Sequence, residues 1–347
     1  MQVNDDFKRR SLRIFSHTRH DHDDHSVERS NEETSNVDKG EESTNETAPI
    51  LETQAPASQE AVQPINTSEI FATQSTVVTP SVENDENHVP EFPLPRVISI
   101  ANQKGGVGKT TTSVNLGAAL AEAGNRVLVI DLDPQGNATS GLGIQHRDLE
   151  GSVYDVIIND KSLEDCTEPT AVRNLFVVPA TIDLAGAEIE LVPAFSREMK
   201  LKKAIKEVTD DYDYVLIDCP PSLGLLTVNA LAASDDVIVP VQCEYYALEG
   251  LMQLLKNVGL VKNNLNEKLN VRGILLTMFD ARTKLSEQVA SEVINNSGVK
   301  VYSTVIPRTV RLSEAPSFGQ PIITFDPTSR GAIAYRELAK EVTNGAS

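Results

Sequence analysis

The chain has 347 residues, with 31 Lys and Arg against 50 Asp and Glu, which gives a formal net charge of −19 at pH 7. Its three cysteines form no CxxC pair, and no apolar run approaches the ~20 residues that cross a bilayer. These features argue against a disulfide scaffold, a cysteine-based zinc site and stable membrane insertion, and we expect a cytoplasmic protein.

The composition changes near Pro95. Residues 1–94 carry 7 Lys and Arg against 19 Asp and Glu, so most of the net negative charge lies there. Apolar residues are too sparse in this segment to offset the cost of ordering the backbone. We therefore predict a disordered acidic extension over 1–94, whose role the sequence does not reveal, and one folded domain over 95–347.

The folded part alternates short apolar runs with helical patterns. "RVISIAN" (96–102) predicts a first strand, and "KTTTSVNLGAALAEAG" (109–124) predicts a helix that Gly124 closes. Further runs rich in Val, Ile and Leu predict strands near 126–131, 175–180, 212–222, 236–242 and 272–280. Helical patterns at 196–210 and 247–265 separate some of them. The expected fold is α/β, a mostly parallel twisted sheet with helices on both faces and a ligand site at the carboxyl ends of the strands.

A glycine-rich loop, "KGGVGKTT", joins the first strand to the first helix. Backbone amides of such a loop and of the helix N-terminus surround phosphates. Lys109 would reach the β and γ phosphates, and the Thr110 hydroxyl would hold Mg²⁺. The predicted nucleotide-binding residues are Lys104, Gly105, Gly106, Val107, Gly108, Lys109, Thr110 and Thr111.

The loop departs from the usual G-x-x-x-x-G-K-[ST] pattern, because Gln103 stands at the first glycine and Lys104 follows it. In this it resembles the deviant Walker A motif of the ParA/MinD ATPases. The resemblance implies that Lys104 reaches the ATP of a second subunit, so that ATP closes a homodimer and Lys104 joins Lys109 as a catalytic residue. A cation supplied in trans resembles an arginine finger.

Three aspartates end predicted strands beside this loop. "VLVIDLDPQG" provides Asp131 and Asp133, and "VLIDCPPS" provides Asp218, which resembles the Walker B aspartate. The resemblance implies that Asp133 orients the attacking water and that Asp131 and Asp218 belong to the Mg²⁺ shell, mostly through water. A carboxylate that only positions water predicts slow hydrolysis.

Segments beyond the loop resemble chromosomal ParA proteins of the Soj type over residues 96–343. They include "DLDPQGNATSGLG", "PATIDLAGAEIELV", "IDCPPSLGLLTVNAL" and "VIPRTVRLSEAPSFGQPI". The cysteines do not fit an iron–sulfur protein, and the C-terminus lacks the basic amphipathic helix of MinD-like proteins. The resemblance implies a nucleoid-associated dimer that binds DNA without sequence preference and hydrolyses ATP when a ParB-like centromere-binding protein stimulates it.

The same resemblance assigns a DNA-binding role to Arg282 and Arg311. Arg308, Lys284, Arg272 and Lys268 are candidates for the same basic surface, although Pro307 and Arg308 also resemble a segment that packs near adenine. Contacts of this kind with phosphates weaken as salt increases.

Two further expectations complete the prediction. Tyr245 and Tyr246 are expected in the core or at the dimer contact. The predicted function is an ATP-dependent DNA-partitioning ATPase, for a chromosome or a plasmid, and the alternative is a nucleotide-dependent switch that regulates replication initiation or transcription.

Overall fold

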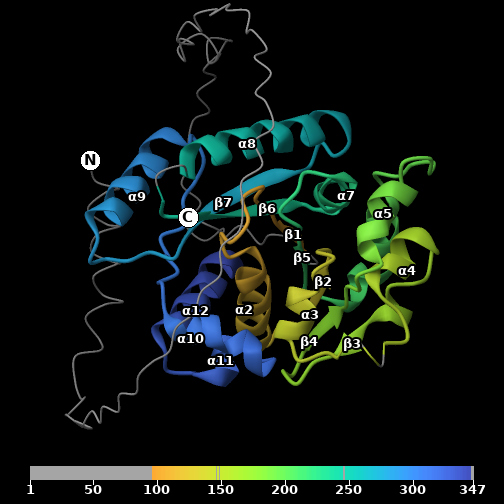
Figure 1. The fold of residues 1–347 in the computed structure, drawn as a ribbon, viewed down its shortest axis with the longest axis horizontal. Helices are drawn as coiled ribbons and strands as arrows, with labels where there is room; N and C mark the ends of the chain where they lie inside the picture. The colour runs from red at the N-terminus through yellow and green to blue at the C-terminus, as the bar shows by residue number, and fades with distance from the viewer. Residues whose placement is uncertain (1–95, 146, 148, 245–246, 345–347) are drawn as a thin grey trace, which may run out of the picture. The chain divides into compact units, whose positions relative to one another are not determined.

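The structure is a computed structural model that describes residues 96–347 except 146, 148, 245–246 and 345–347 (Figure 1). All described residues belong to one compact unit. The predicted extension over 1–94, and the expectation for Tyr245 and Tyr246, lie outside the described residues. Within the described part of the chain, no helix combines the length and the apolar character that crossing a membrane requires.

Seven strands form one sheet in the order β3-β4-β2-β5-β1-β6-β7. All neighbouring pairs are parallel except β3 with β4. The strands are β1 (Arg96–Ile100), β2 (Val127–Asp131), β3 (Glu168–Pro169), β4 (Leu175–Val178), β5 (Tyr214–Asp218), β6 (Asp236–Gln242) and β7 (Asn270–Thr277). The mostly parallel sheet and its six longer strands are confirmed. The two-residue β3 was not predicted, because a segment of that length has no periodicity.

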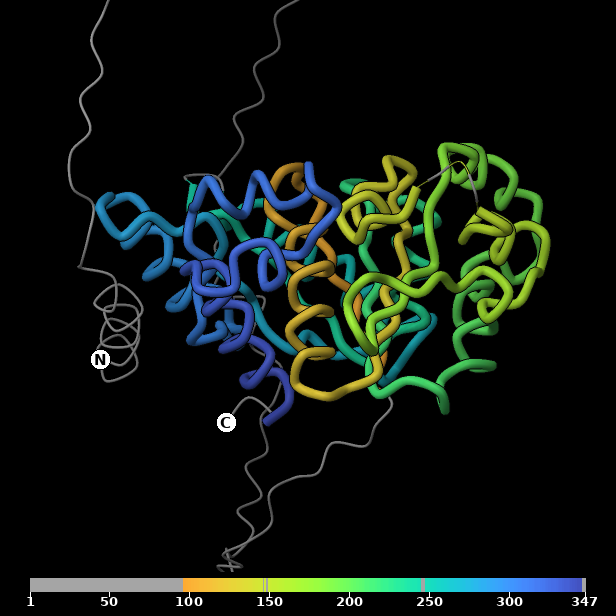
Figure 2. Tube along the Cα trace, turned by 90° about the horizontal axis from the view of Figure 1, so that it is seen from below, coloured from red at the N-terminus to blue at the C-terminus, as the bar shows by residue number. Residues whose placement is uncertain are grey.

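Helices cover both faces of the sheet, as predicted (Figure 1). One face lies against a group that includes α7 and α8, and the other lies against α2, α12 and the short helices beside α12. The longer helices are α2 (Lys109–Glu122), α6 (Lys200–Val208), α7 (Leu225–Ala233), α8 (Ala247–Asn264), α9 (Lys284–Asn296) and α12 (Arg330–Thr343). The shorter ones are α3 (Asn137–Gly141), α4 (Val153–Ile158), α5 (Leu184–Glu190), α10 (Val310–Glu314) and α11 (Ile322–Phe325). The face below the sheet, with α2 and α12 adjacent, is seen in Figure 2.

Helix α2 lies close to the sheet at Gly117. A Cβ atom at this position would come within 3.1 Å of Val129 and 3.3 Å of Leu175. A larger side chain would therefore push α2 away from β2 and β4. Since the phosphate-loop sequence continues directly into α2, this close packing fixes the loop against the sheet.

The amino edge of the sheet holds a buried ion cluster. Asp236 Oδ2 lies 3.4 Å from Arg96 Nη1 and 3.0 Å from Arg272 Nη1, and Arg272 also donates to the Val342 carbonyl. Arg272 is only 8 % exposed. The expectation that Arg272 adds to a basic DNA-binding surface was wrong, because its guanidinium is buried and paired with Asp236 inside the fold.

Candidate functional site

The predicted phosphate loop lies between the end of β1 and the start of α2. Gly106 and Gly108 have φ angles of 74° and 87°, a left-handed conformation that side chains with a Cβ rarely adopt. The Thr277 hydroxyl donates to the Val107 carbonyl at 2.8 Å and ties the loop to the end of β7. The glycines are therefore needed for the backbone path, and β7 supports that path from the side.

The two lysines of the loop have opposite environments. Lys109 is buried, and its ammonium lies 3.3 Å from the Lys104 carbonyl, so it points back under the loop. Burial lowers the pKa of Lys109, and the nearby Asp218 opposes that shift. Lys104 is exposed and pairs with Glu244, with 2.8 Å between Nζ and Oε2. The structure thus places one lysine inside its own loop and the other on the outside.

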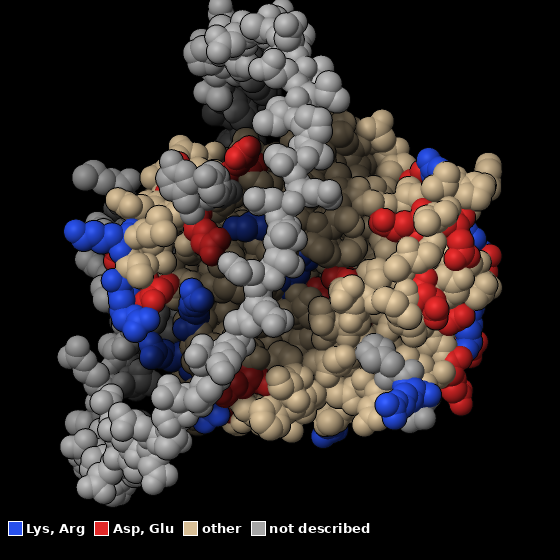
Figure 3. All heavy atoms as spheres, viewed as in Figure 1, with Lys and Arg blue, Asp and Glu red and all other residues tan. Residues whose placement is uncertain are grey.

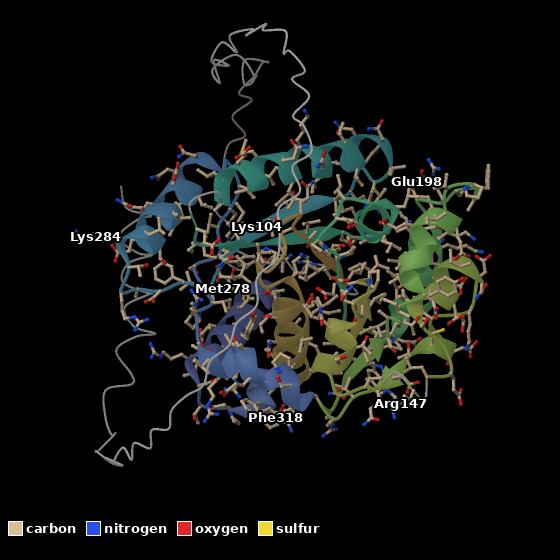
Figure 4. All side chains as sticks on the ribbon, viewed as in Figure 1. Lys104, Arg147, Glu198, Met278, Lys284 and Phe318 are labelled. Atoms are coloured by element: carbon tan, nitrogen blue, oxygen red, sulfur yellow. The ribbon has the colours of Figure 1, made fainter. Side chains whose placement is uncertain are left out.

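Asn102 fixes the backbone from which Lys104 projects. Its side-chain amide donates to the Pro240 carbonyl at 2.7 Å, and its oxygen accepts from the Lys104 amide at 3.0 Å. The Lys104 side chain consequently projects from the loop near the carboxyl end of β6, and this strand ends just before Glu244. Figure 4 labels Lys104 at the centre of the molecule, above the start of α2.

Asp131 and Asp218 end the adjacent strands β2 and β5 and are paired in register. Both are fully buried. Burial raises the pKa of each carboxyl, and the nearby Asp131 raises that of Asp218 further. Asp131 accepts hydrogen bonds from the Thr139 amide at 2.8 Å and from the Thr139 hydroxyl at 2.7 Å. Its carboxylate is thus already occupied by protein donors, which agrees better with a supporting position than with direct metal contact.

The two carboxylate oxygens of Asp218 differ in their hydrogen bonding. Its Oδ1 accepts from the Ser113 hydroxyl at 2.9 Å, whereas Oδ2 is buried without a hydrogen-bond partner in the described structure. A buried carboxylate oxygen without a partner is costly. Thr110, the predicted metal-binding hydroxyl, is close enough to Asp218 to lower the pKa of that carboxyl. The residues present therefore fit a hard cation with oxygen ligands such as Mg²⁺.

Asp133 follows β2 and is 7 % exposed, so it is more accessible than Asp131 and Asp218. Its Oδ1 accepts from the Gln135 amide at 3.0 Å, and its own amide donates to Asp131 at 3.2 Å. It is near enough to Lys109 to influence the pKa of that lysine. These contacts hold the Asp133 carboxylate at the phosphate loop.

Pro307 and Arg308 lie at the same edge of the sheet. The backbone of Phe279, just beyond β7, bonds to the Ile306 carbonyl at 3.0 Å and the Arg308 amide at 3.1 Å. Pro307 is buried and Arg308 is exposed. Since β7 also supports the phosphate loop through Thr277, the segment predicted to pack near adenine is anchored to the same strand.

The two predicted DNA-binding arginines are exposed and bound to acidic neighbours. Arg282 Nη2 lies 2.7 Å from Asp280 Oδ2, and this contact lowers the pKa of Asp280 to about 2. Arg311 lies 3.2 Å from Glu314 and 3.4 Å from Asp326. Lys and Arg gather on the side of α9 and α10, while Asp and Glu gather around α4 and α5 (Figure 3). Lys268 is exposed but precedes β7, at the amino edge of the sheet.

Several residues of the site were not singled out from the sequence. They are Asn102, Ser113, Thr139, Glu244 and Thr277, and each touches a predicted site residue or its backbone. Ser113 lies one helical turn after Lys109, on the buried face, and this spacing could have identified it. The contacts of Glu244 and Thr277 join segments distant in sequence, so local spacing gave no signal for them.

A glycine loop around a buried lysine, a second lysine facing outward and aspartates at adjacent strand ends define a P-loop ATPase with a deviant Walker A motif. Residues 95–271 match the family AAA_31, described as an AAA domain. The chain belongs to this family and, by the relatives described next, to the ParA/Soj-type ATPases.

The similarity covers most of the described part. The chain is 64 % identical to the "Sporulation initiation inhibitor protein Soj" of Bacillus subtilis (strain 168) over 247 residues, which are 71 % of this chain and 98 % of that one. It is 54 % identical to the "Chromosome partitioning protein ParA" of Myxococcus xanthus (strain DK1622), over 71 % of this chain and 87 % of that one. A Mycobacterium smegmatis structure titled cobyrinic acid a,c-diamide synthase, with bound ADP and magnesium, has a TM-score of 0.64 and 42 % identity, covering 72 % and 94 %.

Proposed function

We propose that this chain is a DNA-partitioning ATPase whose ATP-bound dimer holds DNA without sequence preference and releases it after hydrolysis. The observation that carries the proposal is the placement of the two lysines, with Lys109 under the loop and Lys104 outside it. A lysine that serves only its own nucleotide has no need to face solvent. The names of the relatives support partitioning as the use of this cycle.

The nucleotide site follows from the loop. Amides of Gly105–Thr111 and the Lys109 ammonium would bind the phosphates of ATP, with Pro307 and Arg308 beside the base. Thr110 and Asp218 would hold Mg²⁺, which would supply positive charge to neutralise the phosphates, and Asp131 would support these residues. The unpartnered Asp218 Oδ2 supports this assignment.

Hydrolysis requires a positioned water. Asp133, the most accessible of the three aspartates, would orient a water whose oxygen attacks the γ phosphorus. The bond from that phosphorus to the β–γ bridging oxygen breaks, and ADP, phosphate and a proton leave. Lys104 of the second subunit would stabilise the charge that moves to the phosphate oxygens. Because the carboxylate only positions water, turnover would be slow until a ParB-like partner stimulates it.

DNA binding would use Arg282 and Arg311. Both side chains are exposed and currently bound to Asp280, Glu314 and Asp326. Exposed ion pairs of this kind contribute little to stability, so DNA phosphates can replace the carboxylates at little cost. Sequence-independent affinity with strong salt dependence follows.

A second candidate function rests on a printed name. The Bacillus subtilis relative is called a sporulation initiation inhibitor, which favours a switch that regulates replication initiation or transcription through the same nucleotide-dependent dimer. The two candidates differ in whether DNA tethering is required for activity.

The test is binding to a nonspecific duplex with no nucleotide, with ADP and with ATP, over a salt series. The parent is compared with Arg282→Glu/Arg311→Glu. The control is Lys203→Glu/Lys206→Glu, which makes the same change of net charge but on α6. The proposal predicts ATP-dependent, salt-sensitive binding that only the arginine variant loses. Intact ATP binding without DNA binding in any state would reject DNA tethering and favour the switch.

A further inference from the structure

A groove of about 420 Å³ opens at the amino edge of the sheet, between α8, the start of β7 and the segment after α9. Its apolar walls come from Leu255 and Val258 on α8, Leu269 and Val271 at β7, and Val299. Lys262 and Lys300 lie at its border. The volume is within the range of about 300–1,000 Å³ that is typical of ligand sites. None of the nucleotide-binding or DNA-binding candidates lines this groove.

The chain enters the sheet next to the groove. The Val97 amide donates to Asp235 Oδ2 at 3.0 Å, and the Asp235 carbonyl accepts from the amide of Asn270 at 2.9 Å. Asn270 is itself a wall of the groove. Two strand spacings, about 10 Å, separate the start of β1 from the start of β7. The residues just before Arg96 therefore start within reach of the groove.

The sequence that precedes Arg96 is "PEFPLP", residues 90–95. It contains two large apolar side chains, Phe92 and Leu94, and one acidic residue, Glu91. Phe92 and Leu94 each precede a proline, which disfavours helical backbone and favours an extended chain. Extended residues advance about 3.3 Å each, so Phe92 and Leu94 reach about 7–13 Å from Arg96.

We infer that Phe92 and Leu94 of the same chain occupy this groove and that Glu91 faces its lysine border. The apolar walls match the two apolar side chains, the sign of the border charge matches Glu91, and the distance matches the chain length. The segment is bound at the end of the sheet opposite the phosphate loop, so it occupies a surface separate from the ATP site.

The test uses disulfide trapping in the full chain. Pro93→Cys places a thiol between the two apolar residues and leaves both in place. Gly259→Cys places the partner thiol in the groove, where an added Cβ meets nothing within 4 Å. The native cysteines Cys166, Cys219 and Cys243 are buried. We expect rapid oxidation to a disulfide between positions 93 and 259 within one chain, identified by peptide mapping.

Proximity along the chain is not sufficient evidence, since a short tether alone raises the local concentration of the two thiols. The deciding variants keep the tether and remove the docking contacts. Phe92→Ser/Leu94→Ser and, separately, Lys262→Glu should each slow formation of the disulfide, the first by about tenfold. Lys256→Glu, on the same helix but outside the groove, should leave the rate unchanged.

Two outcomes would overturn the inference. Equal rates in the parent, Phe92→Ser/Leu94→Ser and Lys262→Glu backgrounds would show that the groove does not bind the segment. A disulfide that joins two chains, visible as a dimer on a non-reducing gel, would assign the groove to a second copy instead.

Discussion

Lys104 Nζ lies 2.8 Å from Glu244 Oε2, so the outward lysine of the phosphate loop is bound to a carboxylate just beyond β6. Both side chains are close to half exposed, and such a pair contributes little to stability. If Lys104 must leave Glu244 to reach a partner's phosphate, the pair opposes dimerisation by the same small amount.

Glu244→Gln should therefore favour the dimer. We expect the ATP concentration at half-maximal dimerisation to fall about two- to threefold, the effect of losing an exposed ion pair of roughly 0.5 kcal/mol. Analytical ultracentrifugation over an ATP series measures it. The control is Glu337→Gln, which removes a similar surface pair with Lys340 on α12. An unchanged or higher requirement for ATP in Glu244→Gln would refute the opposing role.

Asp133→Ala should separate ATP binding from hydrolysis. Asp133 makes no contact that the loop needs for its shape, because Thr277 and Gly108 hold the loop. We expect ATP affinity close to that of the parent and a hydrolysis rate at least about 100-fold lower, the usual effect of losing a residue that positions the reacting proton. Phosphate release measures the rate.

Gln135→Ala, two residues further along and exposed, is the matched control and should hydrolyse ATP normally. Hydrolysis by Asp133→Ala at the parental rate would show that another group orients the water.

The sequence predicted the sheet and the loop because their signals are local. Val, Ile and Leu runs marked all six longer strands, and the glycines and Lys109 lie within eight residues of one another. The function of Arg272 could not be predicted in this way. Its partner Asp236 is on the neighbouring strand, so only the register of β6 and β7 shows that the charge is buried.

The same limit applies to the site. The three aspartates were found because strands end there, but the difference between them depends on tertiary contacts. Thr139 donates a hydrogen bond to the carboxylate of Asp131. Asp218 accepts a hydrogen bond from Ser113 through one carboxylate oxygen, whereas its other oxygen has no partner in the described structure. The contact between Ser113 and Asp218 joins residues 105 positions apart in the chain, and a single sequence gives no pairing information at that distance.

The cysteines should be unreactive in the folded protein. All three thiols are buried, and burial raises the pKa of Cys166 to about 11 and that of Cys243 to about 12, with Cys219 raised as well. The thiolate is the reactive form, so at pH 8 all three remain protonated. We expect almost no modification by a thiol reagent at pH 8 and three modified thiols after denaturation, counted by mass spectrometry. Fast labelling of the native protein would contradict the buried positions.

The most direct test of the proposed cycle compares the two lysines of the loop in sedimentation with ATP and Mg²⁺, in an Asp133→Ala background that limits hydrolysis. Lys109→Ala should lose ATP binding. Lys104→Ala should bind ATP almost as the parent does, because its side chain lies outside its own loop, and should remain a monomer. A Lys104→Ala protein that forms the ATP-dependent dimer as readily as the parent would contradict the account.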